Sequence, residues 1–255
     1  MSGFASAGCF FLDSNIILSD ILKENTPRVE KLKKDSDFHK IPCYISKSVE
    51  KESYRKVEET CNFLGKVVRD TIGYHLLESR SRKGIPPTAP ITSEDIKALE
   101  DLFSGYYSAM KTAKVGMPSP VALIEEWAIS FLGEKLDKGV AIDVNRFLVE
   151  LVKGLLALTS SIEDLYDDLV TFEKGFITTK SVTVDASKCL TLQKIGIHKP
   201  DCSHIAGAIN HQTKSKEKTV FVTLDFATIL NKRHLIWRRF KIECCDPLYA
   251  LHHLI

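Results

Sequence analysis

An aspartate directly follows an apolar run in the segment CFFLDSNIIL, at residues 9–18. A short Phe-rich run bounded by turn-forming residues is typical of a buried strand, which predicts that the chain leaves a sheet at Asp13. A second run, TVFVTLD at 219–225, ends in the same way at Asp225. Because parallel strands bring their carboxyl ends to one edge, we expect both carboxylates there. The alternative is that the Asp-Ser-Asn triplet only begins a turn or caps the next helix.

A third carboxylate, Asp201, lies in KPDCSHIAGAIN, in the first turn of a helix that Pro200 is expected to begin. Alone, it is explained by its interaction with the helix dipole. His204 follows one turn later, where a lone helical histidine is usually structural. Clustered carboxylates raise one another's pKa and destabilise the fold unless a cation neutralises them. Such oxygen donors suit Mg²⁺ or Mn²⁺, and one or two ions could support phosphodiester hydrolysis.

The elements that must position these acids alternate between strands and helices. Strand patterns are found at 41–46, 181–185, 219–225 and 241–245, in addition to the first run. Their alternation with helices predicts an α/β fold with a mostly parallel sheet. Apolar stripes at helical spacing, which are most simply core faces, make 93–174 nearly all helix.

Four helices are expected in this helical section, which follows a loop with three prolines that ends near residue 93. The second helix begins at Ser119 and Pro120, because proline fits the first helical position. The fourth is expected to begin at Ser160, which has capping-box spacing to Glu163.

Composition gives an ordinary globular chain of 255 residues, 44% hydrophobic, with a net charge of +2. A net charge this small does not indicate a nucleic-acid partner, although positive charge can still be concentrated in one part of the chain. The seven cysteines include no CxxC pair, which favours free thiols in a reducing compartment. The first residues lack a basic segment and a membrane-spanning apolar run. We therefore expect a cytoplasmic protein without membrane contact.

Several segments, in this order, resemble the PIN-domain family of nucleases. LDSNIIL resembles the first family motif, IPCYISKSVEKE the second strand and the helix with the second acid, and SVTVD the third strand. KPDCSHIAGAIN resembles the helix with the third acid, VFVTLD the T-x-D motif, and IECCDPLYAL the closing strand and tail. The resemblance covers roughly residues 8 to 60 and 180 to 250. It implies a three-layer core around a parallel sheet, with acids at one edge.

Carried over by this resemblance, the catalytic and metal-binding acids are Asp13, Glu52, Asp201 and Asp225. Thr223 and Asn15 are expected as supporting residues. The second acid is ambiguous. In the family pattern it stands three positions after an apolar residue of the helix, so Val49 indicates Glu52, and Glu50 is the alternative. Either glutamate alone would be an ordinary solvated residue on a helix face.

The middle of the chain departs from the family pattern, since compact members have a much shorter connection there. The expected organisation is a nuclease core formed by residues 1–60 and 181–255, with a mainly helical elaboration at 61–180. The elaboration offers a surface for a protein partner.

Basic residues concentrate in the C-terminal part, where residues 188–241 contain eleven Lys or Arg and three Asp or Glu. TKSKEK at 213–218 is expected in a turn, and Trp237 lies within the second basic run at 231–241. Such a mixture either holds phosphates and stacks a base, or is a solvated helix face with the tryptophan in the core. The candidate nucleic-acid contacts are Lys214, Lys216, Lys232, Arg233, Arg238 and Arg239.

These features together predict a Mg²⁺- or Mn²⁺-dependent nuclease. The resemblance implies that it is an endoribonuclease that acts on single-stranded or unpaired RNA, in processing or quality control. The alternative is a non-catalytic RNA-binding scaffold of the same fold in a ribonucleoprotein assembly. A haloacid-dehalogenase-like phosphatase would need a second aspartate two positions after Asp13, where Asn15 stands. Nucleotide-binding glycine loops and the GxSxG and HExxH motifs are absent from the sequence.

Overall fold

The chain forms two compact units in the computed structural model, which describes residues 8–22, 26–112, 119–170 and 176–254. The sheet unit comprises 1–57 and 163–255, and the helical unit comprises 58–162. The divisions fall within helices α3 (Lys47–Lys66) and α7 (Val144–Val170). The boundaries expected from the sequence were residues 60 and 181, so the second division comes earlier than expected.

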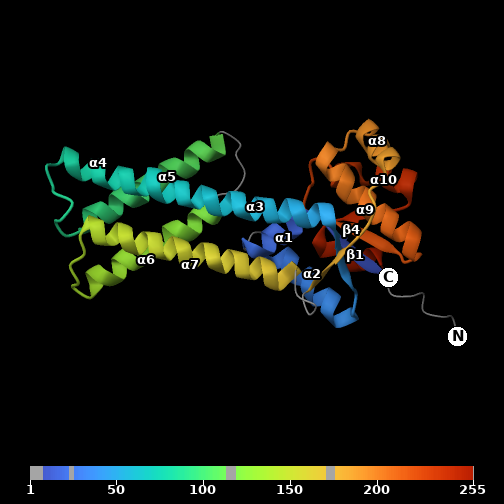
Figure 1. Ribbon diagram of the computed structural model, residues 1–255, viewed down its shortest axis with the longest axis horizontal. Helices are drawn as coiled ribbons and strands as arrows, with labels where there is room; N and C mark the ends of the chain where they lie inside the picture. The colour runs from blue at the N-terminus through green and yellow to red at the C-terminus, as the bar shows by residue number, and fades with distance from the viewer. Residues whose placement is uncertain (1–7, 23–25, 113–118, 171–175, 255) are drawn as a thin grey trace. The chain divides into compact units, whose positions relative to one another are not determined.

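A five-stranded sheet organises the sheet unit (Figure 1). Its strands are β1 (Cys9–Leu12), β2 (Cys43–Ser46), β3 (Ile177–Lys180), β4 (Thr219–Val222) and β5 (Glu243–Cys245). The order is β3-β2-β1-β4-β5, and every neighbouring pair is parallel. The α/β fold with a parallel sheet is therefore confirmed.

Strand β1 lies at the centre of the sheet and is buried on both sides. Successive side chains of a strand point to opposite faces. Phe11 faces a core cluster under helix α9, whereas Phe10 and Leu12 point the other way, and all three have no exposed surface. A strand buried on both faces needs a continuous apolar run, and CFFL provides one.

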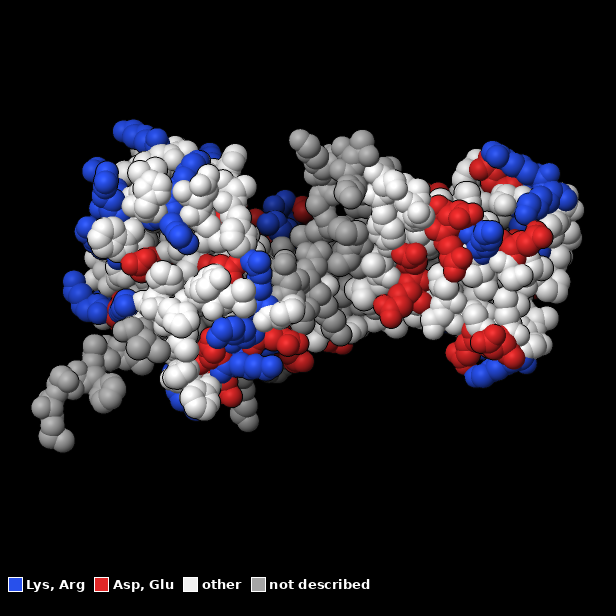
Figure 2. Space-filling model, turned by 180° about the vertical axis from the view of Figure 1, so that it is seen from behind, with Lys and Arg blue, Asp and Glu red and all other residues white. Residues whose placement is uncertain are grey.

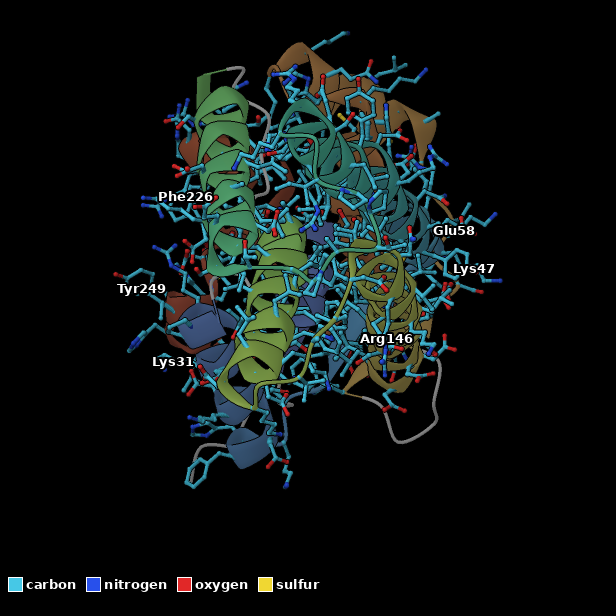
Figure 3. All side chains as sticks on the ribbon, turned by 90° about the vertical axis from the view of Figure 1, so that its left-hand side faces the viewer. Lys31, Lys47, Glu58, Arg146, Phe226 and Tyr249 are labelled. Carbon is cyan, nitrogen blue, oxygen red and sulfur yellow. The ribbon has the colours of Figure 1, made fainter. Side chains whose placement is uncertain are left out.

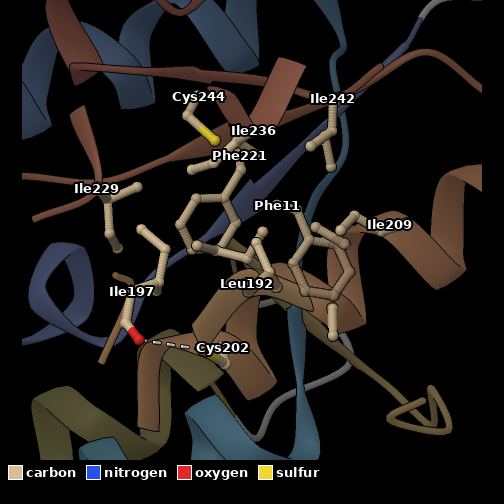
Figure 4. Packing of buried hydrophobic residues seen from close by; sticks show 13 residues of the cluster. Phe11, Leu192, Ile197, Cys202, Ile209, Phe221, Ile229, Ile236, Ile242 and Cys244 are labelled. Carbon is tan, nitrogen blue, oxygen red and sulfur yellow. Dashed lines mark hydrogen bonds between the residues drawn. The ribbon is translucent and has the colours of Figure 1, made fainter. Parts of the chain in front are cut away.

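The core on the α9 side joins the sheet to three helices, α8 (Ala186–Lys194), α9 (Lys199–Ser215) and α10 (Arg233–Phe240). Figure 4 shows Phe11 and Phe221 between the strands and these helices. Both rings are fully buried, and Ile205 and Ile236 belong to the same cluster. This packing holds α9 against the sheet and so sets the position of its side chains relative to the strand ends.

The remaining helices of the sheet unit follow β1 and β2. Helix α1 (Ser14–Ile21) begins directly after Asp13, and α2 (Thr26–His39) was not predicted. Helix α3 begins after β2, where the Ser46 side chain accepts a hydrogen bond from the N–H of Val49. Short 3-10 helices are found at Leu230–Lys232, Pro247–Tyr249 and Leu251–His253.

The helical unit contains the end of α3, a π-helical turn at Val67–Gly73, α4 (Tyr74–Arg82), α5 (Ser93–Thr112), α6 (Ser119–Asp137) and most of α7. The predicted stripes bury residues such as Leu99, Ile124 and Phe147, so they are core faces. Arg80 is also buried, and its guanidinium donates to the Asp95 carboxylate at 2.6 Å and to the Ala89 carbonyl.

Two predicted boundaries were wrong. The third strand is Ile177–Lys180 rather than 181–185, because all four residues of β2 pair with it in register from Cys43–Ile177. The following segment leads into α8, whose N-cap is Asp185. The predicted third and fourth helices form the single helix α7, and Ser160 lies inside it. The spacing of Ser160 and Glu163 therefore does not mark the start of a helix here.

None of the helices in the described ranges combines the length and the apolar character that a bilayer-spanning segment requires.

Candidate functional site

Asp13 lies where β1 ends and α1 begins, and its carboxylate accepts four hydrogen bonds. Oδ1 accepts from the N–H of Ser14 at 2.8 Å and contacts Nδ1 of His204 at 2.9 Å. Oδ2 accepts from the Thr223 hydroxyl at 2.7 Å and from the Asn15 amide at 2.9 Å. The side chain is almost completely buried. A carboxylate offers about four lone-pair positions, so these partners occupy the available acceptor sites.

Thr223 and Asn15 connect the ends of β1 and β4. The Thr223 hydroxyl donates to Asp13 and accepts from the Asn15 amide at 3.0 Å and from the N–H of Asp225 at 3.1 Å. Asn15 Oδ1 accepts from the N–H of Leu224 at 3.1 Å. Thr223 and Asn15, the two residues expected to support the site, therefore hold Asp13 in a hydrogen-bond network that includes the backbone of the segment after β4.

His204 lies between two of the predicted acids. Its Nδ1 is 2.9 Å from Asp13 Oδ1, and its Nε2 is 2.8 Å from Glu52 Oε2. Burial alone would lower the pKa of this imidazole, but the hydrogen bonds to Asp13 and Glu52 raise it to about 9. Both ring nitrogens donate only when the ring is protonated, so His204 is an imidazolium at neutral pH.

The structure places Glu52 rather than Glu50 at this site. The hydrogen bond from His204 lowers the pKa of Glu52 to about 2, and Lys56 adds to the shift from 2.7 Å. The backbone carbonyl of Glu50 instead accepts from the hydroxyls of Ser53 and Tyr166. Of the two glutamates that the resemblance left open, Glu52 is the one that approaches His204.

Asp201 is the acid whose charge is least compensated. It lies in the first turn of α9, half-buried, and no side-chain hydrogen bond among the described residues reaches its carboxylate. Burial raises its pKa to about 6, and the negative charges of Asp13, Asp225 and Glu52 contribute, whereas His204 opposes them. Three carboxylates are therefore close enough to Asp201 to act on it electrostatically.

Asp225 follows β4 in the loop after Thr223, and its side chain is partly exposed. Its Oδ1 accepts from the N–H of Thr228 at 2.8 Å. The exposed ring of Phe226 comes next and points to the surface, as Figure 3 shows. The guanidinium carbon of Arg28 lies 5.2 Å from the centre of that ring. Phe226 was not predicted as a site residue. The signal in the sequence that could have identified it is its position directly after Asp225.

The acids fit a divalent cation in charge and donor type. Four carboxylates face one imidazolium and the ammonium of Lys56, which leaves two negative charges when every acid is ionised. Among the described residues, however, no three of these acids bring ligand oxygens within 4.8 Å of one another. His204 fills the space between Asp13 and Glu52. Any ion would therefore be held first by Asp201 and Asp225, which have open acceptor positions.

The basic residues predicted to contact nucleic acid lie on α9 and α10 and between them. Figure 2 shows Lys and Arg side chains over the end of the sheet unit that carries α8 and α10. Arg233, Arg238 and Arg239 on α10 are exposed, whereas the Lys232 ammonium donates to the Gly196 carbonyl. Lys214 and Lys216 are exposed too.

One expectation about this basic region was wrong, and one of its two alternative interpretations is contradicted. Helix α9 extends to Ser215, so Lys214 is helical, and Lys216 ends the helix in the left-handed conformation. Trp237 is 45% exposed rather than in the core, and the Lys241 ammonium lies 4.2 Å from the centre of its ring. An exposed tryptophan beside arginines keeps the base-stacking interpretation of this region open.

No family model, curated protein or solved structure matches this chain.

The imidazolium of His204 makes a testable contribution to stability. Its folded pKa of about 9 exceeds the ordinary value of 6.5, so the stabilisation is complete below about pH 6.5 and is lost as pH rises through 9. We expect the free energy of unfolding to fall by roughly 3 kcal/mol over this range. Urea unfolding of the sheet unit, followed by Trp237 fluorescence in a Trp127→Phe background, measures it.

His204→Gln should remove this pH dependence, and His198→Gln is the matched control because His198 is exposed at the start of the same helix. Equal slopes for both variants above pH 6.5 would contradict the assignment of the charged imidazole.

Proposed function

We propose that this protein is a metal-dependent endoribonuclease that hydrolyses phosphodiester bonds of single-stranded or unpaired RNA. The observation that carries the proposal is Asp201, a half-buried carboxylate that accepts no side-chain hydrogen bond from the described residues. Its pKa is raised to about 6 by burial and by three other carboxylates. The dipole of α9 favours a charge in its first turn, but burial and the neighbouring carboxylates disfavour the ionised form of Asp201. Uncompensated carboxylates at the carboxyl end of a parallel sheet favour a cation-dependent site.

Asp201 and Asp225 would hold Mg²⁺ or Mn²⁺, with Asp13 and Glu52 completing the negative surroundings. When bound, such an ion supplies an activated water and stabilises the leaving oxygen of a phosphodiester. Other residues of the chain position the carboxylates. Thr223 and Asn15 fix Asp13 in place, and the His204 imidazolium holds Asp13 and Glu52 together. RNA rather than DNA is proposed from the resemblance to PIN-domain nucleases.

Contacts for unpaired RNA are available on the same unit. Phe226 is 54% exposed, directly after Asp225, so a base could stack on the ring face that Arg28 does not cover. The exposed arginines of α10 provide positive charge for phosphates. A duplex would not offer an unstacked base to Phe226, which favours a single strand.

A non-catalytic RNA-binding scaffold is the second candidate, and one observation favours it. The acceptor positions of Asp13 are all used by protein donors, and His204 neutralises part of the acidic cluster without any metal. A protein that retains the fold but not the chemistry would tolerate such an arrangement. Cleavage and binding of RNA must therefore be measured separately.

The carboxylates are tested by cleavage of a labelled single-stranded RNA in Mn²⁺, Mg²⁺ or EDTA. Asp225→Asn should lower the metal-dependent rate at least about 100-fold, because it removes a proposed ligand whose loss costs more than a supporting contact. Asp201→Asn should do the same. Asp37→Asn, on an exposed helix position of the same unit, should cleave like the wild type.

RNA binding without cleavage by the wild-type protein would favour the scaffold. Cleavage that survives equally in Asp225→Asn and Asp201→Asn would expose a contaminating nuclease and refute the active-site assignment. Circular dichroism of each variant shows whether a lost rate reflects lost structure.

The stacking role of Phe226 has a control in Phe38, which is 80% exposed on α2. Phe226→Ala should weaken binding of single-stranded RNA about tenfold, because stacking of one base contributes roughly 1–3 kcal/mol. Phe38→Ala should leave the affinity unchanged. Fluorescence anisotropy with a labelled RNA measures both, and an equal effect of the two substitutions would count against a specific stacking position.

The arginines of α10 should act through phosphates. Replacing Arg238 and Arg239 together with alanine should lower affinity uniformly across RNA sequences. It should also reduce the slope of log affinity against log salt by about 1.4, since each phosphate contact on a single strand contributes about 0.7. Arg82→Ala, an exposed arginine of the helical unit that pairs with Glu78, is the control. An unchanged salt slope in the double variant would place the RNA elsewhere.

A further inference from the structure

A second group of potential ligands lies at the opposite end of the sheet from the acids. Cys9, His211 and Glu217 each bring one ligand atom within 4.8 Å of the others. Cys9 begins β1, His211 is near the end of α9, and Glu217 lies in the short connection from α9 to β4. The proposed nuclease chemistry uses none of these residues.

Helix α9 places one histidine near each end of strand β1. His204 and His211 are seven residues apart, which puts them on the same face of the helix, about 10 Å apart. His204 contacts Asp13 beyond the end of β1, and His211 approaches Cys9 at its start. One helix face therefore delivers an imidazole to each end of the same strand.

The surroundings of His211 orient its ring. The ring centres of Phe11 and Tyr44 lie 5.8 and 5.1 Å from that of the imidazole, and Nε2 is 3.3 Å from Glu217 Oε2. Aromatic contacts that restrict the imidazole lower the entropy lost when it binds a ligand. The ring is only slightly exposed, with 12% of the His211 side chain accessible, whereas Glu217 is 36% exposed and leaves a route from solvent.

Cys9 is completely buried, and its Sγ lies 3.4 Å from the Thr219 hydroxyl, a donor suited to a thiolate. Burial raises the pKa of the thiol to about 11, with a contribution from Glu217, so Cys9 is protonated at neutral pH. A thiolate must therefore form when a metal binds, and one proton must leave.

We propose that Cys9, His211 and Glu217 bind a zinc-class divalent cation. A thiolate and an imidazole select such an ion over Mg²⁺ or Mn²⁺, and Zn²⁺ accepts a carboxylate as a third ligand. Three protein ligands leave a fourth tetrahedral position for water. The ion would join the start of β1 to the end of α9 and to the connection before β4, which stabilises the sheet unit.

The test is a Zn²⁺ titration of the full chain against a chromophoric chelator, with excess Mg²⁺ present to occupy the oxygen-ligand site. The wild type should bind one ion with release of about one proton from Cys9. Co²⁺ in place of Zn²⁺ should produce the near-ultraviolet charge-transfer absorption of a thiolate ligand. Zn²⁺ should also raise the melting temperature, because it binds the folded state preferentially.

Cys9→Ser should lower Zn²⁺ affinity at least about 100-fold and abolish the Co²⁺–thiolate band, since removing a ligand costs more than removing a supporting contact. Cys61→Ser, a cysteine of α3 outside this group, is the matched control. Because Cys9 is in the core, His211→Gln and the partly exposed Glu217→Gln provide variants that are independent of its packing. Absence of Zn²⁺ binding by the wild type, or affinity unchanged in all three ligand variants, would overturn the proposal.

Discussion

The carboxylate of Asp13 is the interaction on which the carboxyl edge of the sheet depends. Its four hydrogen bonds come from the start of α1, from Thr223 after β4 and from His204 on α9. Glu52 on α3 joins through the other nitrogen of the same imidazole. A buried carboxylate without these donors would cost several kcal/mol, so each segment must keep its place for the edge to exist. Figure 1 shows how these segments converge around β1 and β4 in the sheet unit.

The same edge holds more negative charge than its own cations balance. His204 and Lys56 neutralise Glu52 and part of the charge around Asp13, while no described side chain donates a hydrogen bond to Asp201. Charge that the fold leaves uncompensated lowers stability, and such sites are typical of places where a ligand is bound. The sheet unit also carries exposed arginines on α10, and the exposed ring of Phe226 directly follows Asp225. A polyanion with an unstacked base matches both features.

Helix α9 gives the two ends of the sheet different chemistry. Its N-terminal turn contributes Asp201 and then His204 to a group of oxygen donors, while its last turns place His211 beside a thiol. Hard oxygen ligands and soft sulfur and nitrogen ligands prefer different ions. Two metals could therefore bind one sheet unit without competing for the same ligands. Packing of α9 against Phe11 and Phe221 sets the register that both ends require.

The sequence by itself determined several local elements and the aspartates that follow the two central strands. The runs before Asp13 and Asp225 predicted β1 and β4, and Pro200 predicted the start region of α9, whereas Glu52 was expected only from the resemblance to the PIN-domain family. These signals depend on neighbouring residues, through side-chain alternation, helical spacing and the restricted backbone of proline.

Only the tertiary structure decided which distant groups meet. Pairing with β2 set the third strand at Ile177–Lys180, and the predicted third and fourth helices formed the single helix α7. His204 was predicted to be an ordinary structural histidine, yet it lies between Asp13 and Glu52, and Cys9 meets His211 across 202 positions of the sequence. Such contacts depend on how α9 packs across the whole sheet, so no local pattern encodes them.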